Sequence, residues 1–161
     1  MDSSRGLLIA VLIVSAANLL LTGIQTGLIL RQPAAHNSAA LPKAFTEAEL
    51  AKIARRVTEP YNRGDIDALY DVLDDVAKNQ IPRQRLAEQI AQINGLVGKV
   101  DSAAYVGFQK LPNQGGLEIY QLNYVVKLSG GRFQSGGMIV NVIDRPQAPG
   151  IVGFFINGKS Q

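Results

Sequence analysis

The chain has 161 residues, a formal net charge of +3, no cysteine and one histidine. Without cysteine it has no disulfide or thiolate chemistry, and the single histidine, His36, precedes the part of the sequence that can form a core, which removes the usual metal and triad ligands from the fold. Basic residues after position 98 stand singly, without the dense basic stripe and interleaved aromatics of a nucleic-acid-binding domain. The sequence therefore predicts no metal, no cofactor and no nucleic-acid partner.

An uncharged apolar segment occupies residues 6–30. A helix needs about 20 apolar residues to cross the hydrocarbon core, so this segment is long enough to span a membrane. A cleaved signal peptide has a shorter apolar core of about 7–15 residues, although the small residues over 33–40 leave processing open. We therefore predict a cytoplasmic head over residues 1–5, a single-pass signal-anchor helix over 6–30 and an extracytoplasmic domain, for example a periplasmic one; the charge rule barely discriminates between the two orientations.

Polar side chains recur along this predicted span at steps of three, four and three residues, which places them on one stripe of a helix. Hydrogen bonds between such groups in membranes contribute about 0.6 kcal/mol each, enough to favour association with a partner helix. The polar residues are Ser15, Asn18, Thr22 and Gln25. Gly23 and Gly27, on the opposite face, permit close backbone approach. The alternative is a lone span that tolerates these residues without a partner.

Residues 31–44 form an Ala/Pro-rich linker without apolar periodicity, which we expect to be extended. Residues 45–161 have the length of one globular domain. Its first helix has a clear start signal, with Thr46 as N-cap and Glu49 three residues later to complete a capping box. Phe45 and Leu50 are placed as a hydrophobic staple. We expect the helix to end or bend near Pro60.

Two further helices are predicted. Asp65 is the N-cap of the second, whose apolar stripe runs over residues 66–76 at steps of three or four. Pro82 takes the first position of the third helix, and Gly98 ends it. The acids elsewhere on the wheel of the second helix, which we expect to be solvated, are Asp71, Asp74 and Asp75.

After Gly98 the apolar period changes from helical to two, which predicts antiparallel strands separated by Gly/Pro-rich turns. The expected strands cover residues 99–109, 117–128, 132–142 and 151–158. Tyr120, Leu122 and Tyr124 share the buried face of the second strand. The predicted fold class is α+β: one N-terminal transmembrane helix, then three helices packed on a curved four-stranded antiparallel sheet.

The segment Tyr61-Asn62-Arg63-Gly64-Asp65-Ile66-Asp67-Ala68-Leu69-Tyr70, with this order of elements, resembles the nuclear transport factor 2-like superfamily, or cystatin-like cone. In this corner Gly64 permits the sharp turn and Asp65 caps the next helix. The resemblance covers residues 45–158 and implies the fold rather than one function, since the superfamily includes isomerases, dehydratases and transport factors. In layout the chain is also similar to the inner-membrane assembly factor of type IV secretion systems, which places one such domain after one span.

Enzymes of this superfamily place an Asp or His inside the open end of the cone. In this sequence Glu118 is the one carboxylate expected to look into it, although a charged residue at the start of a strand is the simpler interpretation. The aromatic residues near it are equally typical of a core. The candidate cone lining is Tyr70, Tyr105, Glu118, Tyr120, Tyr124 and Phe154, which Phe108 could join. We predict no catalytic residue and a non-enzymatic chain.

The expected function is that of a membrane-anchored binding or assembly module at the cell membrane, which docks a protein partner or a second copy on the outer face of its sheet. Support comes from the third strand, which is expected to carry apolar side chains on both faces. These are Phe133, Met138, Val140 and Val142. The alternatives are a small apolar ligand in the cone entrance or, with less support, an isomerase- or dehydratase-like enzyme.

Overall fold

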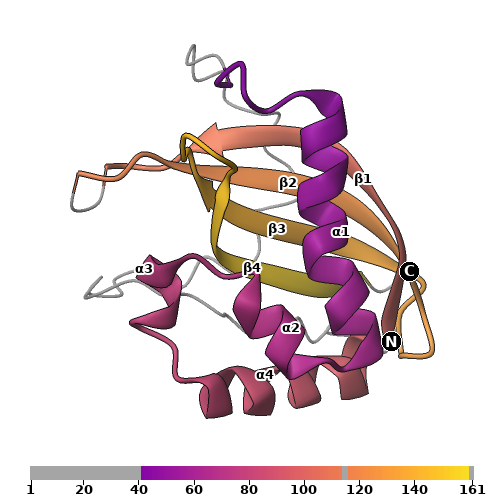
Figure 1. Cartoon of the computed structure of the whole chain (residues 1–161). Helices are drawn as coiled ribbons and strands as arrows, with labels where there is room; N and C mark the ends of the chain where they lie inside the picture. The colour runs from indigo at the N-terminus through magenta and orange to yellow at the C-terminus, as the bar shows by residue number, and fades with distance from the viewer. Residues whose placement is uncertain (1–40, 114–115, 160–161) are drawn as a thin grey trace, which may run out of the picture.

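The computed structural model describes residues 41–113 and 116–159, in which a helical part precedes a sheet (Figure 1). The helices are α1 (Glu47–Arg63), α2 (Ile66–Asp71), α3 (Asp75–Lys78) and α4 (Arg83–Val97). The strands are β1 (Lys99–Lys110), β2 (Ile119–Ser129), β3 (Ser135–Ile143) and β4 (Gly150–Lys159). They form one antiparallel sheet in the order β1-β2-β3-β4, which confirms the strands that the change of period after Gly98 predicts.

The expected fold class is corrected in its first element. Among the residues that the structure describes, no helix is both long enough and apolar enough to cross a membrane. The expected transmembrane helix, and with it the single-pass and signal-anchor description, is therefore not found in the part of the chain that the structure describes. Residues 6–30, to which the span was assigned, lie outside the described residues, as do the polar stripe and the small-residue face within them.

The start of α1 follows from local sequence. Thr46 is the N-cap, and its Oγ1 accepts a hydrogen bond from the Glu49 backbone N at 3.2 Å. Phe45 and Leu50 are both buried, as a hydrophobic staple requires. The Glu49 carboxylate lies 3.6 Å from Lys52 Nζ. The helix continues through Pro60 and ends at Gly64.

The expected second helix is two helices, so the described chain has four helices rather than the three expected. The break falls after α2, where Leu73 forms a parallel bridge with Ile151 of β4 and the Asp74 backbone N donates to the Ile151 carbonyl at 2.7 Å. Asp74 then caps α3 by accepting from Val76 N at 3.0 Å. A contact between residues distant in sequence therefore interrupts a helix that the local pattern favours.

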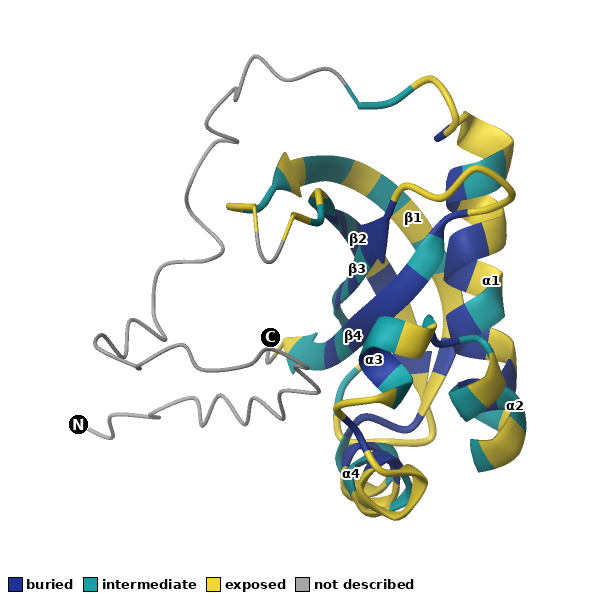
Figure 2. Cartoon of the chain, turned by 60° about the vertical axis from the view of Figure 1, so that its left-hand side comes forward, coloured by how far each residue is buried: buried dark blue, intermediate teal, exposed yellow. Residues whose placement is uncertain are grey.

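One face of the curved sheet is buried beneath the helices (Figure 2). Alternate residues of β2, from Tyr120 to Leu128, are buried, and the Tyr124 hydroxyl donates to the Leu50 carbonyl of α1 at 3.0 Å. The turn between β2 and β3 meets the end of α4, where Arg132 N donates to the Leu96 carbonyl at 3.0 Å. Both layers thus share one core.

The expectation that the third strand is apolar on both faces through Phe133, Met138, Val140 and Val142 is wrong. Met138, Val140 and Val142 are alternate residues, so all three point to the same face, where they are fully buried. Phe133 precedes β3 and is only partly buried, with its ring against Gly158. The apolar surface on the opposite face of the sheet comes from other residues, described below.

Candidate functional site

The corner motif between α1 and α2 is engaged in holding the fold together. The Tyr61 hydroxyl, at the buried end of α1, donates to the Gly98 carbonyl at 2.8 Å, and burial raises the pKa of Tyr61 to about 12. The Asn62 amide donates to the Val100 carbonyl at 2.8 Å, and its oxygen accepts from the Val100 backbone N at 2.9 Å. Asn62 thereby pairs with the edge of β1 as a neighbouring strand would.

The two residues after Arg63 complete this corner. Gly64 has φ of 64°, a left-handed conformation that glycine adopts without a Cβ penalty. Asp65 Oδ1 accepts from Ala68 N at 3.0 Å and so caps α2. Polar side chains of the motif, among them Tyr61, Asn62 and Asp65, therefore stabilise the fold through hydrogen bonds to the backbone.

The residues of the candidate cone lining come from several elements, and four of them meet in two pairs, Tyr105 with Tyr124 and Glu118 with Tyr120. Tyr70 is on α2, partly buried, and its hydroxyl donates to the Lys78 carbonyl at 3.3 Å. Tyr105 and Tyr124 form an edge-to-face pair across β1 and β2, with ring centroids 5.8 Å apart. Phe154 is 1% exposed within the core. The hydroxyls of Tyr70 and Tyr124 are engaged by backbone carbonyls, so neither is available to a ligand in this arrangement.

Glu118 lies on the exposed rim between β1 and β2. Its Oε1 is 2.5 Å from Lys110 Nζ, and its Oε2 accepts from the Tyr120 hydroxyl at 3.1 Å. The hydrogen bond from Lys110, and then the one from Tyr120, hold the pKa of the Glu118 carboxyl below its ordinary value. A general base near neutral pH needs a raised pKa, so these contacts make Glu118 a weak candidate for proton abstraction.

An aromatic cluster lies behind this rim. The Tyr120 ring is 5.7 Å from that of Phe45 and 6.5 Å from that of Phe108, measured between centroids. Lys110 Nζ lies 5.9 Å from the centroid of the Tyr120 ring, within reach of a cation–π interaction. Phe45 is the member of this cluster that the cone lining inferred from the sequence omits. Its signal was its staple position before α1.

The sheet face opposite the helices, here called the outer sheet face, is formed by alternate residues of β2, β3 and β4. Val125 is 54% exposed, whereas Ile139 and Phe155 are partly exposed and neighbour each other in the register of β3 and β4. Gln121 Nε2 donates to Asn123 Oδ1 at 3.1 Å. The residues of the outer sheet face include Gln121, Asn123, Val125, Ile139, Asn141, Phe155 and Asn157.

Two further features describe the outer sheet face. Asn141 Oδ1 is buried there and has no hydrogen-bond partner among the described residues. The charged residues around the outer sheet face stand at the ends of the strands. At one end, Lys127 and Lys159 both neighbour Ser135 in the register. Asp144 follows β3 at the other end and is exposed. The middle of the face is therefore neutral, a mixture of aliphatic, aromatic and amide side chains.

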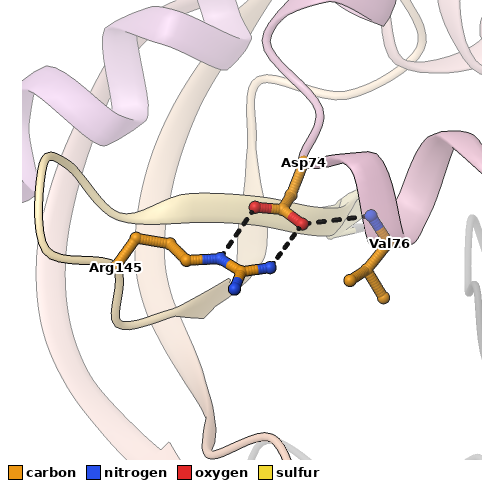
Figure 3. Close-up of polar contacts among 3 residues, drawn as sticks. All are labelled: Asp74, Val76 and Arg145. Atoms are coloured by element: carbon orange, nitrogen blue, oxygen red, sulfur yellow. Dashed lines mark hydrogen bonds and ion pairs between the residues drawn. The ribbon is translucent and has the colours of Figure 1, made fainter.

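A second polar cluster joins the helical layer to the loop between β3 and β4 (Figure 3). Arg145 Nε donates to Asp74 Oδ2 at 3.2 Å, and Arg145 Nη2 donates to Asp74 Oδ1 at 3.0 Å. Burial raises the pKa of Asp74, but the bonds from Arg145 and Val76 outweigh it and leave this pKa below its ordinary value. Arg56 of α1 reaches the same loop, with Nη1 3.0 Å from the Pro149 carbonyl.

Comparisons with known proteins add no assignment to this geometry. The chain matches no protein-family model, and no match is found among curated proteins. Within residues 41–113 and 116–159, no cluster of three or more His, Cys, Asp or Glu side chains is arranged to hold a metal ion. The resemblance to the nuclear transport factor 2-like superfamily stays a prediction.

Proposed function

We propose that the chain is a non-enzymatic binding or assembly module, whose outer sheet face engages a protein partner. The observation that carries this proposal is the character of that face. Val125, Ile139 and Phe155 present apolar surface on the side of the sheet away from the helices, with amide side chains around them. Apolar and aromatic side chains with few charges are typical of the centre of a protein interface.

The placement of polar groups supports a protein partner over a charged ligand. Lys127, Lys159 and Asp144 stand at the ends of the strands, where they would form the rim of an interface. Asn141 Oδ1, buried and without a partner among the described residues, is an acceptor that a donor of the partner would satisfy. The order of helices and strands further supports membership of the nuclear transport factor 2-like superfamily, which we propose as the fold family.

The test is a charge introduced at the centre of the face. In full-length protein, Val125→Arg should weaken partner binding or self-association by about tenfold or more, because burial of an unpaired charge at an interface centre is costly. Ala51→Arg is the matched control, since Ala51 is also exposed but lies on α1, on the helical side of the sheet. The readouts are analytical ultracentrifugation for self-association and mild affinity purification with mass identification for other partners.

The outcomes separate the possibilities. A stoichiometric partner that is lost with Val125→Arg and kept with Ala51→Arg supports the proposal. Equal binding by the wild type and both variants would contradict it, as would equal loss in both variants, because the outer sheet face would then have no particular part in binding.

A further inference from the structure

The segment that joins α2 to α3 is held in a conformation that its own sequence does not favour. Apolar residues recur over 66–77 at helical spacing, and the pattern predicts one continuous helix. In the structure α2 stops at Asp71, and Asp74 takes an extended conformation with φ −66° and ψ 153°. The broken form must therefore be stabilised by contacts outside the segment.

The first such contact covers part of a sheet edge. β4 is an edge strand, so backbone groups that point away from β3 have no strand partner. Leu73 forms a parallel bridge with Ile151, and Asp74 N donates to the Ile151 carbonyl at 2.7 Å. These two contacts occupy the edge at the start of β4. Because the Asp74 N–H would bond to the Tyr70 carbonyl in a continuous helix, the two arrangements exclude each other.

The second contact is the pair of arginines that fixes the loop after β3. Arg145 binds both carboxylate oxygens of Asp74, an arrangement in which ion pairs are strongest. Arg56 Nη1 binds the Pro149 carbonyl, and Arg56 Nη2 lies 3.4 Å from the Val72 carbonyl, so one guanidinium holds both the loop and the break. In this structure, these contacts hold the segment in its broken form.

Both forms keep the same apolar stripe against the core. Leu69, Leu73 and Ala77 are buried in the structure, and their spacing of four residues places them on one face of a continuous helix. A change from the broken segment to one continuous helix can therefore keep these side chains buried. Two further bonds that span the break, from Tyr70 Oη to the Lys78 carbonyl and from Lys78 Nζ to the Asp71 carbonyl, would be exchanged for helical bonds.

We propose that residues 72–76 form a switchable cover over the start of the β4 edge, where they block pairing by the Ile151 carbonyl. The Asp74–Arg145 ion pair controls this cover. With the pair made, the segment is broken and covers Ile151. With the pair removed, residues 66–78 close into one helix and the Ile151 carbonyl is released to solvent. The device is a local two-state element rather than a general loss of stability.

The experiment removes the pair from either side in the full-length protein. In Arg145→Gln and in Asp74→Ala, the amide of residue 74 should exchange its hydrogen about tenfold faster or more. The Cα chemical shifts of residues 73 and 74 should move toward helical values. The control is Arg132→Gln, which removes an exposed arginine from the turn between β2 and β3. Among the described residues, the Arg132 side chain forms no ion pair. The Leu122 amide in the sheet core reports on global stability.

The proposal holds if Arg145→Gln and Asp74→Ala show both changes while their Leu122 amide exchanges as in the wild type. The Arg132→Gln protein should also stay at wild-type values. It fails if residues 73 and 74 keep extended shifts and the amide of residue 74 stays protected. A parallel loss of protection at Leu122 would also overturn it, since the variants would then be globally destabilised.

Discussion

Tyr61 and Asn62 show at the level of single residues why the corner motif has its particular composition. Both side chains leave the end of α1 and bind backbone groups of the first residues after α4, at Gly98 and Val100. The sequence indicated the roles of Gly64 and Asp65, because turn and cap preferences are local. It gave no sign of the partners of Tyr61 and Asn62, which lie 37 and 38 residues away in sequence.

Replacement of Asn62 tests this role. Asn62→Ala removes both bonds to Val100, which is 3% exposed, and leaves its backbone N–H and C=O without these partners. We expect the free energy of unfolding to fall by about 1–3 kcal/mol, the range for buried polar groups that lose a partner. Urea denaturation measures the change. In the control, Arg63→Ala, only an exposed 4.0 Å ion pair with Asp65 is lost, so a shift below about 0.5 kcal/mol is expected. Equal shifts would remove the special role of Asn62.

At the level of elements, the helix starts and the strands follow from sequence, but the break between α2 and α3 does not. Capping residues and a period of two are local signals, and they place α1 and the sheet correctly. Leu73 and Asp74 leave the helical pattern where Ile151, at the start of β4, accepts the Asp74 backbone N–H. The expectation that Asp74 is merely solvated was wrong for the same reason, since Arg145 is distant in sequence.

Two glycines in helical regions offer a matched pair of substitutions. Gly64→Ala should destabilise the domain by about 1 kcal/mol, because φ of 64° disfavours any side chain although the site has space for a Cβ. Gly95→Ala, within α4, should stabilise it by about 0.5–1 kcal/mol, because alanine has the higher helix propensity and a Cβ there meets no atom within 4 Å. Thermal unfolding of the two variants should shift in opposite directions. Shifts of the same sign would contradict this account of the two backbone conformations.

At the level of the whole molecule, the two layers share a core in which tyrosine side chains are buried with their hydroxyls. Burial is the main cause that raises the pKa of Tyr61 to about 12, and it also raises those of Tyr105, Tyr120 and Tyr124 above the ordinary value of 10.0. Ionisation of these groups is thus coupled to folding.

The sign of this coupling follows from the direction of the shifts. Between the unfolded pKa of 10.0 and the higher folded values, the folded protein holds protons that the unfolded chain has released, so stability falls as pH rises through this window. Below it, these tyrosines leave stability unchanged. We expect tyrosinate absorbance to rise late and together with unfolding, and the urea midpoint to be lower at about pH 11 than at about pH 9. Ordinary titration of all tyrosines near pH 10 in folded protein would contradict this.

The sequence by itself determined the class of the domain and the location of its elements, because caps, turns and apolar period act within a few residues. It also indicated that thiolate and disulfide chemistry is absent, since the chain contains no cysteine. Only the tertiary structure decided which groups meet. It paired Tyr105 with Tyr124 and Glu118 with Lys110, and placed Ile139 and Phe155 beside each other on the outer sheet face. Register and long-range contacts made these choices, and neither is encoded in a local pattern.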